Sequence, residues 1–433
     1  MRVLVIGAYG LIGSAVVNDL LAHGVEVVGL GRDTAQASRA LPGARWVRAD
    51  LSALTTIDAW LPVLRDCQPE AVVNCAGVLQ DSARDNVFAV QADAISALIA
   101  ACEALVIRRF VQISAPRAGI DADTAFMRSK GVADAALTAS TLDWWVLRPG
   151  LVLAPQAYGG SAMLRALAAM PLVIPVVHAD CEVQTVAVSD VATATRHCLV
   201  GALPAGRRFD LVEATPHTLA EVVTALRAWL GLPPAPVLRL PQMLARTVAM
   251  VADGLACLGW RSPLRTTAMR ELAHGVTGDA RAWEAASGMR LQGLGETLQR
   301  MPSTVQERWF ARLFLLKPVV VFTLAMFWLV TAAVTVINPT PALALLTSAG
   351  LTGATAKLIA FGGAVLDALL GCAILHRRTL DAAALAMIAV TAVYLVGATI
   401  VLPALWADPL GPLVKPIPAA LLALGLLAIA DDR

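Results

Sequence analysis

The stretch that decides the fold is Val3-Leu4-Val5-Ile6-Gly7-Ala8-Tyr9-Gly10-Leu11-Ile12-Gly13. Four apolar residues, typical of a buried strand, run directly into a GxxGxxG pattern, and an apolar helical pattern follows as far as Gly24. A second apolar run at residues 25–30 completes a strand–helix–strand unit of about 30 residues, which is the context that a dinucleotide fingerprint requires. We therefore predict a dinucleotide site whose phosphates lie on the free amides at the start of the helix. The predicted contact residues are Gly7, Tyr9, Gly10, Leu11, Ile12 and Gly13.

The alternation of strands and helices continues along the chain. Further strands are predicted at residues 45–48, 71–74, 110–114 and 144–147, with helical patterns between them. Strands separated by helices form a parallel sheet that binds ligands at the carboxyl ends of its strands. We therefore expect an α/β Rossmann core, a doubly wound parallel sheet, over residues 1–153. Residues 154–303 are expected to add a small substrate lobe and a helical extension, with strands near Val183 and Phe209.

The end of the second strand, Gly29-Leu30-Gly31-Arg32-Asp33, bears on the choice of cofactor. NAD sites place an acidic residue here for the ribose 2′-hydroxyl, whereas an arginine accommodates the 2′-phosphate of NADP. The tip carries no acid and Arg32 follows Gly31, which favours NADP, with NAD as the second choice. Two alternatives stay open: Asp33 turns inward to the ribose, or Arg32 is only a solvated loop charge.

The composition requires a membrane. Hydrophobic residues make up 58% of the 433 residues, above the level of soluble domains. Only 10 charged residues fall within residues 318–433, whereas the first 317 residues carry the other 56. A formal net charge of +2 without a Lys/Arg run argues against nucleic acid as a partner.

Cysteine usage and the start of the chain bear on the compartment. Seven cysteines lack CxxC spacing, so we expect reduced cytosolic thiols and neither a metal site nor a disulfide framework. The first apolar run is too short for a secretory signal, so we expect the N-terminus to stay in the cytoplasm.

Four apolar stretches follow Lys317, at residues 318–337, 358–375, 382–402 and 413–430. They predict a C-terminal all-α four-helix transmembrane bundle within residues 304–433, preceded by a leading helix over 304–315. The stretch 342–351 is too short to span and is expected to be a loop or an interfacial piece. Counting Lys and Arg residues places six on one side of the membrane and two on the other, with both chain ends in the cytoplasm of a multi-pass inner-membrane protein. The six are Arg308, Arg312, Lys317, Arg377, Arg378 and Arg433, and the two are Lys357 and Lys415.

Asp367 and the apolar stretch 241–258 each allow two interpretations. Asp367 falls in the middle of the second predicted span, where a carboxylate is expected to be protonated or paired. It would either handle protons or contact a quinone, or make a hydrogen bond between helices. The apolar stretch 241–258 fits either a helix that rests on the membrane surface or one that packs between domains.

The first 310 or so residues resemble the atypical and extended short-chain dehydrogenase/reductases, particularly the NmrA-like group and the nucleotide-binding accessory subunit of respiratory complex I. The matching pieces are GAYGLIG, Asp50-Leu51, Asn74-Cys75-Ala76-Gly77, Ser114, Ser129-Lys130 and Leu147-Arg148-Pro149-Gly150. The resemblance implies that Asp50 and Leu51 contact the adenine and that Ala76, Gly77 and Pro149 line the cofactor. It also implies that Ser114 and Lys130 belong to the catalytic group. The last 115 or so residues resemble DoxX-like domains, four-helix membrane proteins linked to quinone-associated oxidation.

One departure from the dehydrogenase pattern stands out. The family's tyrosine, four residues before Lys130, is replaced by Phe126, which has no proton to give to a carbonyl oxygen. Either Ser114 alone supplies the proton, or Tyr158 reaches the site from the substrate side, or carbonyl reduction is not performed. Lys130 also has an alternative role, in which it holds the nicotinamide ribose by hydrogen bonds to its hydroxyls.

Two functions from different classes follow. The first is a membrane-anchored NAD(P)(H)-binding oxidoreductase that acts on a lipid-soluble substrate, a quinone or a lipid carbonyl. The second is a non-catalytic NADP(H)-binding redox sensor, or an assembly or stability factor that partners a membrane complex. In both cases the lipid bilayer is an expected partner.

Overall fold

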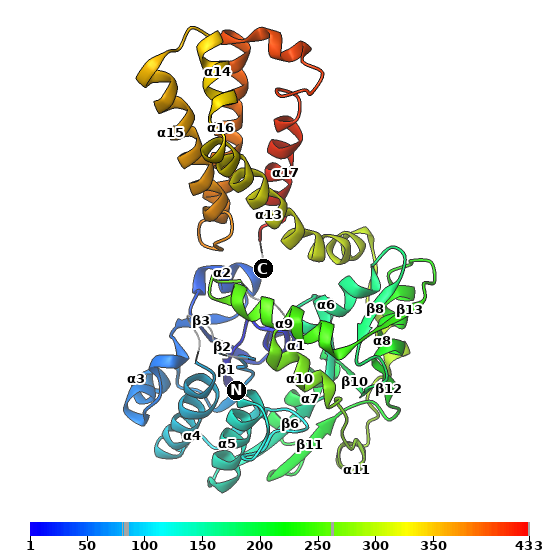
Figure 1. Ribbon diagram of the computed structural model, residues 1–433. Coiled ribbons are helices and arrows are strands. Elements are labelled where there is room, and N and C mark those ends of the chain that lie inside the picture. The colour runs from blue at the N-terminus through cyan, green and yellow to red at the C-terminus, as the bar shows by residue number, and fades with distance from the viewer. Residues whose placement is uncertain (80, 82–85, 261–263, 432–433) are drawn as a thin grey trace. The chain divides into compact units, whose positions relative to one another are not determined.

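The computed structural model describes residues 1–79, 81, 86–260 and 264–431 (Figure 1). Arg433, which the charge count above includes, lies outside them. The chain forms two compact units. The first comprises Met1–Asp253 and Ser262–Arg308, and the second comprises Gly254–Arg261 and Trp309–Arg433.

The first unit is built on a seven-stranded parallel sheet in the order β11-β6-β5-β4-β1-β2-β3 (Figure 1). The strand order reverses direction between β1 and β4, so the crevice at their carboxyl ends is the expected ligand position. This confirms the doubly wound parallel sheet, and the predicted strand bounds agree to within two residues. The strands are β1 (Arg2–Ile6), β2 (Glu26–Gly31), β3 (Arg45–Arg48), β4 (Ala71–Asn74), β5 (Arg109–Ile113), β6 (Asp143–Pro149) and β11 (Arg207–Leu211).

The placement of Phe209 corrects the prediction that its strand belongs to the small lobe. Phe209 lies in β11, which pairs with β6 so that Phe209 is opposite Leu147 at the edge of the main sheet. The crossover helix α7 (Val188–Leu199) returns the chain to the sheet after the lobe has begun. A strand that follows lobe segments in sequence can therefore rejoin the core.

Alternate residues of the strands point to opposite faces, and each face has its own apolar core. Val3 and Val5 of β1 pack in one core with Leu20 of helix α1 (Leu11–Ala22). Leu4 and Ile6 pack in the other, with residues of α3 and α4. The apolar run that predicted a buried strand thus fills both layers. The remaining helices beside the sheet are α2 (Thr34–Ala40), α3 (Ile57–Cys67), α4 (Ala94–Ala104) and α5 (Ala125–Ala139), with a π-helical turn η2 (Ala89–Asp93) before α4.

The small lobe consists of three two-stranded sheets and short helices. A buried carboxylate, Glu213, ties it together by accepting hydrogen bonds from the Thr185 and Leu294 amides, at 2.7 Å each. The paired strands are β7 (Leu151–Leu153) with β10 (Thr185–Ala187), β8 (Ile174–Val177) with β13 (Val237–Leu240), and β9 (Glu182–Val183) with β12 (His217–Thr218). The helices of this part are α6 (Gly159–Ala168), α8 (Leu219–Trp229), α9 (Gln242–Ala256), α10 (Thr266–Ala273), α11 (Arg281–Ser287) and α12 (Leu294–Arg300).

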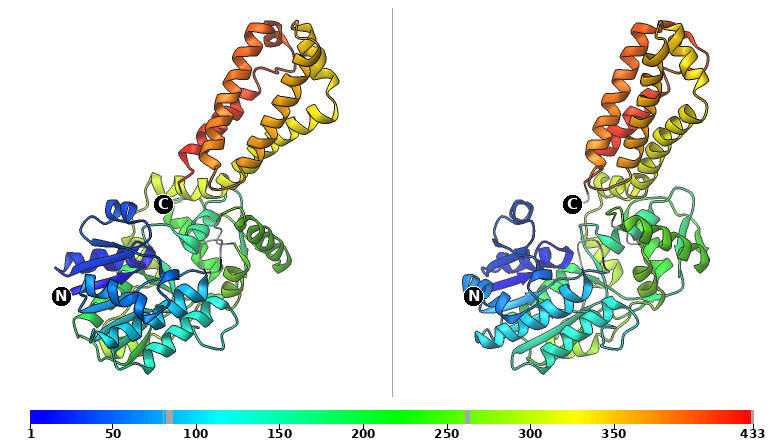
Figure 2. Two further views of the ribbon diagram at one scale, coloured as in Figure 1. Left: turned by 90° about the vertical axis from the view of Figure 1, so that its left-hand side faces the viewer. Right: turned by 60° about the vertical axis from the view of Figure 1, so that its left-hand side comes forward.

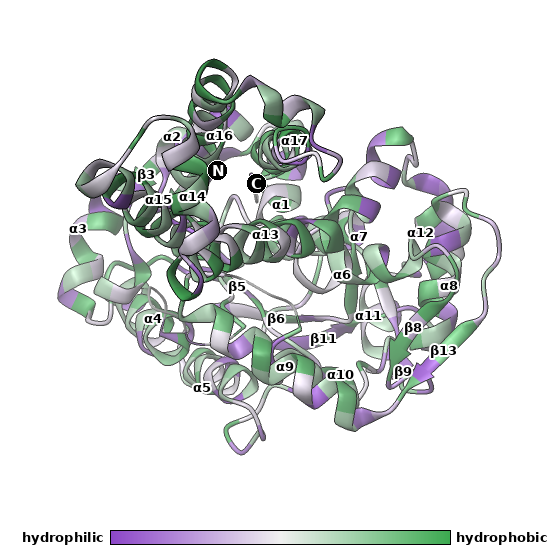
Figure 3. Ribbon diagram, turned by 45° about the horizontal axis from the view of Figure 1, so that its top comes forward, coloured by the Kyte–Doolittle hydropathy of each residue, from purple (hydrophilic) through white to green (hydrophobic). Residues whose placement is uncertain are grey.

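The second unit is helical and apolar (Figures 2 and 3). Among the described residues, three helices are long and apolar enough to cross a membrane: α13 (Val305–Ile337), α15 (Gly353–Ala373) and α16 (Leu380–Val401). Helix α13 runs through Pro318 without a break, so the predicted leading helix and first span are one helix of 33 residues. The stretch expected to be a loop or interfacial piece contains a short helix, α14 (Thr340–Ser348).

The fourth predicted span is wrong as a full-length helix. Helix α17 (Pro416–Ala428) has 13 residues, which at 1.5 Å per residue reach about 20 Å, whereas a bilayer core is about 30 Å thick. Pro416 lies at its first position, so the helix begins three residues after the start of the apolar run. The expected four-helix transmembrane bundle is therefore three full-length helices plus a shorter one packed on α16.

Candidate functional site

The glycine-rich loop between β1 and α1 leaves room for a pyrophosphate. A side chain on Gly7 would place its Cβ 2.9 Å from the Ala76 amide nitrogen, and one on Gly13 would lie 2.1 Å from the Gly7 carbonyl oxygen. These two glycines are therefore required by the protein's own packing. A Cβ on Gly10, at the N-cap of α1, meets only the Gly7 oxygen, at 3.1 Å. Gly10 thus keeps space open at the helix N-terminus, where a phosphate binds to free amides.

The carboxyl ends of the parallel strands gather the other predicted contact residues on one edge of the sheet. Ala76 and Gly77 follow β4, and the Ala76 amide donates to Asn74 Oδ1 at 3.0 Å. Pro149 is the buried last residue of β6. Asp50 and Leu51 follow β3, and the Asp50 carboxylate accepts from the Ser52 amide at 3.1 Å. Leu11 and Ile12 form the first turn of α1.

The ring of Tyr9 covers the tip of β2. A Cβ on Gly31 would lie 2.2 Å from Tyr9 Cε1, so the tip has no room for an acidic side chain in this arrangement. Arg32 follows and is exposed. The Asp33 carboxylate accepts from the Gln36 amide at 2.9 Å and caps α2. Asp33 is thus engaged at the helix end, away from the inward position left open by the sequence.

A buried polar cluster lies at the end of β5. Lys130 of α5 donates from Nζ to the Ile113 carbonyl oxygen at 3.0 Å, and its Nζ lies 5.6 Å from the centre of the Phe126 ring. Burial lowers the pKa of Lys130, and the charge of Asp134 opposes that shift. The ring at the position where a tyrosine was expected therefore lies beside the lysine.

Ser114 has a partner that the sequence analysis did not identify. Its Oγ donates to Asp134 Oδ2 at 2.6 Å, within the range of hydrogen bonds to a carboxylate. Burial raises the pKa of Asp134, whereas the Ser114 hydrogen bond and the charge of Lys130 lower it. Asp134 lies one helical turn after Lys130, and that i, i+4 spacing was the available signal.

A second missed residue, Gln91 of η2, faces the same space. Its Nε2 donates to the Val78 carbonyl oxygen at 2.9 Å, while its buried Oε1 has no hydrogen-bond partner among the described residues. A Cβ on Gly77 would lie 3.7 Å from that oxygen and 4.0 Å from Lys130 Nζ. The backbone at Gly77 is thus flanked by an acceptor and a cation, a combination that suits the hydroxyl groups of a ribose.

Tyr158, the candidate substitute for the missing tyrosine, lies at the N-cap of α6 and is 44% exposed.

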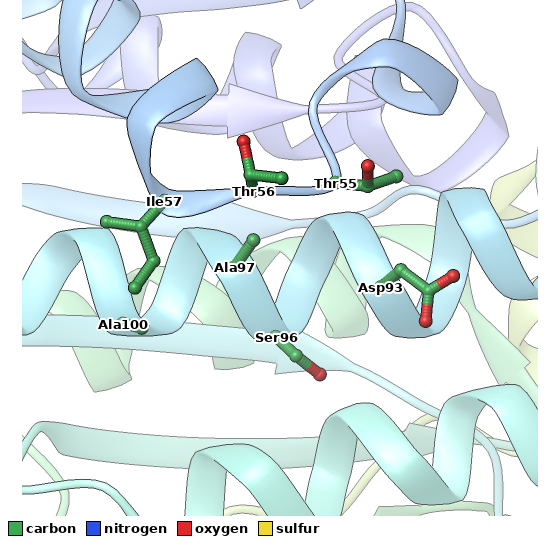
Figure 4. Close-up of a pocket in the computed structure, with 7 residues that line it drawn as sticks. All are labelled: Thr55, Thr56, Ile57, Asp93, Ser96, Ala97 and Ala100. Atoms are coloured by element: carbon green, nitrogen blue, oxygen red, sulfur yellow. The ribbon is translucent and has the colours of Figure 1, made fainter.

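A shallow depression of about 590 Å³ lies between the start of α3 and α4 (Figure 4). It is lined by Thr55, Thr56, Ile57, Asp93, Ser96, Ala97 and Ala100, none of which is a predicted site residue.

In the second unit, Asp367 of α15 is buried and paired. Tyr394 of α16 donates from its hydroxyl to Asp367 Oδ1 at 3.3 Å. A Cβ on Gly363, one turn before Asp367, would lie 3.2 Å from the same hydroxyl oxygen. The small residue thus lets the phenol approach the carboxyl group, and this confirms the expectation that Asp367 is protonated or paired.

We expect Asp367→Leu and Tyr394→Phe each to lower the thermal stability of the second unit, by about 1 kcal/mol through loss of one hydrogen bond. The double variant should cost less than the sum, because both changes remove the same bond. Unfolding of the purified chain in detergent measures this, with Asp381→Leu, at an exposed position of α16, as the control. Additive losses would show that the two side chains do not interact.

Two family matches agree with this geometry. Residues 7–168 match the NAD(P)H-binding family, and residues 325–424 match the DoxX-like family. The chain joins an NAD(P)H-binding domain to a DoxX-like domain. The first match contains the glycine loop, Lys130 and Pro149, and the second contains Asp367 and Tyr394.

The NAD(P)H-binding domain has relatives of known structure or activity. A 2-alkyl-3-oxoalkanoate reductase of Shewanella oneidensis is 27% identical over 285 residues, which cover 58% of this chain and 71% of that protein. The enzyme WbmH of Bordetella bronchiseptica in complex with NAD+ has a TM-score of 0.53 at 17% identity, covering 72% of this chain and 97% of its own. The UDP-glucose 4-epimerase of Thermus thermophilus, complexed with NAD, has a TM-score of 0.52 at 22% identity, covering 69% and 98%. The domain therefore has the short-chain dehydrogenase/reductase fold.

Proposed function

We propose that the chain is a membrane-anchored, NADP(H)-dependent oxidoreductase that reduces a lipid carbonyl. The observation that carries the proposal is the buried Lys130 beside Gly77, at the sheet edge that the glycine loop opens. Similarity to a 2-alkyl-3-oxoalkanoate reductase supports a carbonyl with alkyl substituents as the substrate class. The DoxX-like domain holds this site next to a substrate that partitions into lipid, which raises its effective concentration.

NADP is the proposed cofactor, with NAD as the second choice. Tyr9 excludes an acidic side chain at residue 31, and Asp33 caps α2, so the tip of β2 offers the exposed Arg32 to the ribose. A guanidinium forms strong charge-assisted hydrogen bonds with a phosphate. Gly7, Gly10 and Gly13 would hold the pyrophosphate, while Lys130 and Gln91 would hold the nicotinamide ribose.

The residues around Ser114 supply a route for the proton. When bound, NADPH supplies a hydride to the carbonyl carbon. The carbonyl oxygen then takes a proton, which Phe126 cannot give. Ser114 Oγ can give its hydroxyl proton to that oxygen when Asp134 starts as the carboxylic acid, a form that burial favours by raising its pKa. The acid then donates its own proton to Ser114 Oγ across their 2.6 Å contact and is left as the carboxylate, which regains a proton from water before the next turnover.

We further propose that the chain is a multi-pass protein of the inner membrane with its NAD(P)H-binding domain in the cytoplasm. Lys317 Nζ and Arg377 both donate to the Ala430 carbonyl oxygen, at 2.7 and 3.0 Å. The apolar part of α13, the α15–α16 connection and the end of α17 therefore meet at one end of the second unit, and that end collects positive charge. Positive ends of membrane domains face the cytoplasm.

A second candidate function rests on Phe126. A chain that binds NADPH without a tyrosine at this position would serve as a redox sensor or as a stability factor of a membrane complex. Oxidation of NADPH by the purified full chain separates the two, with a long-chain 3-oxo ester and a ubiquinone analogue as substrates. Turnover of the ester supports the lipid carbonyl, turnover of the quinone alone replaces it, and binding without turnover of either supports the sensor.

Phe126→Tyr should raise carbonyl reduction by at least about tenfold, because a phenol beside Lys130 is a general acid and such groups contribute about 10²–10⁴-fold. Lys130 Nζ already lies 5.6 Å from the centre of the ring that would carry the added hydroxyl. Steady-state NADPH oxidation measures the gain, with Phe88→Tyr, at an exposed position, as the control. An unchanged rate would mean that the ring does not face the substrate.

A further inference from the structure

Helix α9 holds its large apolar side chains away from the first unit. Its buried residues are Ala245, Ala249 and Ala252, which recur on one face of the helix. Met243 is 80% exposed and Met250 is 64% exposed. The helix thus touches the protein through methyl groups, whereas its bulky residues have no partner in the part of the chain that the structure describes.

The exposed residues form one broad apolar surface. Leu244, Val248, Val251 and Leu255 follow the helical spacing i, i+4, i+7 and i+11, and the two methionines border them. Arg246, which is exposed, and Asp253, which is half-buried and accepts from Arg265 at 2.9 Å, form a narrow polar strip. Thr247 lies between the methionines and Val251, and its hydroxyl donates to the Met243 carbonyl oxygen at 3.2 Å. A helix that packs between domains would turn its largest apolar residues inward, so this arrangement argues against that reading.

The chain just beyond α9 is fixed to the end of a membrane-spanning helix. The Leu258 carbonyl oxygen accepts from the Arg377 amide at 3.0 Å, and Trp260 Nε1 donates to the Leu375 carbonyl oxygen at 2.6 Å. Leu375 and Arg377 directly follow α15. Leu258 lies three positions after Leu255, a reach of at most about 11 Å.

That end of α15 has the character of a membrane–water boundary. Trp260 has the aromatic side chain that is enriched there, and Arg377 and Arg378 supply positive charge. We propose that α9 lies in the cytoplasmic surface of the bilayer, with its apolar surface among the acyl chains and Arg246 at the level of the lipid phosphates. The lipid occupant follows from this continuity with the membrane helices, and it does not depend on the proposed oxidoreductase activity.

Photo-crosslinking in lipid tests the proposal on the full chain. A benzophenone side chain replaces Met250 or Val251, and the protein is reconstituted into nanodiscs of phosphatidylethanolamine and phosphatidylglycerol. The control replaces Val106, which is 71% exposed and lies between α4 and β5, at the amino ends of the parallel strands. Circular dichroism checks that each variant is folded.

We expect lipid adducts at both α9 positions in at least about fivefold excess over the Val106 control, because a surface-lying helix buries its apolar face below the headgroups. Adduct yields equal to the control would overturn the proposal. Crosslinks to a second copy of the chain would also overturn it, because the surface would then be a dimer contact. Benzophenone in place of Arg246 should give a lower lipid yield than in place of Val251, since the polar strip faces the water.

Discussion

Gly10→Val should weaken NADPH binding by at least about 100-fold and leave the first unit folded. A Cβ at this position meets only one protein atom, the Gly7 oxygen at 3.1 Å, a tight contact that requires the loop to shift by a few tenths of an ångström. The two further methyl groups of valine would extend into the space that the loop keeps open at the start of α1. A pyrophosphate could then no longer approach the helix amides. Fluorescence or calorimetric titration with NADPH measures the loss.

Gly295→Val provides the matched control for this experiment. Gly295 also lies in the first turn of a helix, α12, and no atom lies within 4 Å of its added Cβ. Binding by this variant should equal that of the wild type. Circular dichroism should show both variants folded. Undiminished NADPH binding by Gly10→Val would show that the dinucleotide does not lie on this loop.

Arg32→Ala should weaken NADPH binding by about 1.5–3 kcal/mol, which corresponds to roughly 10- to 150-fold, and should leave NADH binding nearly unchanged. The physical reason is that only NADPH has a 2′-phosphate to receive charge-assisted hydrogen bonds from a guanidinium at the tip of β2. Raised ionic strength should reduce the difference between the cofactors, because an exposed ion pair is screened by salt.

Arg39→Ala is the control for Arg32, because Arg39 is an exposed arginine in the adjoining helix α2. It should change the binding of neither cofactor. A loss of equal size for NADPH and NADH in Arg32→Ala would contradict the NADP proposal. It would instead indicate that Arg32 supports the structure around the tip.

The sheet could be predicted from sequence because its strands are apolar runs bounded by turns and separated by helical patterns. Those signals are local, and they place six of the seven strands to within two residues. The seventh, β11, was assigned to the lobe because its partner β6 lies some 60 residues earlier in the chain. Similarly, hydropathy alone does not indicate that helix α17 begins only at Pro416 and is therefore shorter than the apolar run around it.

In the candidate site, too, the residues that have local sequence signals were predictable, and those that depend on distant contacts were not. The glycine loop and the residues after the strands were predictable because parallel strands end on one edge. Gln91 and Tyr394 were not, since their roles depend on contacts with residues in other elements: Ser129 lies 38 positions from Gln91, and Asp367 lies 27 positions from Tyr394. Asp134 was within reach of sequence reasoning, because it lies one helical turn from Lys130.

The contact between Tyr9 and Gly31 bears on how cofactor preference could evolve or be engineered. In this fold, a switch to NAD is usually sought by one acidic substitution at the tip of the second strand. Here Gly31→Asp alone would place its new Cβ 2.2 Å from Tyr9 Cε1. The Tyr9 ring would have to move, and this would disturb the loop that is proposed to hold the phosphates. Specificity and affinity are thus coupled through one aromatic ring. A redesign would have to replace Tyr9 by a smaller residue first and introduce Gly31→Asp second. In the reverse order, the single variant Gly31→Asp would bind neither cofactor well.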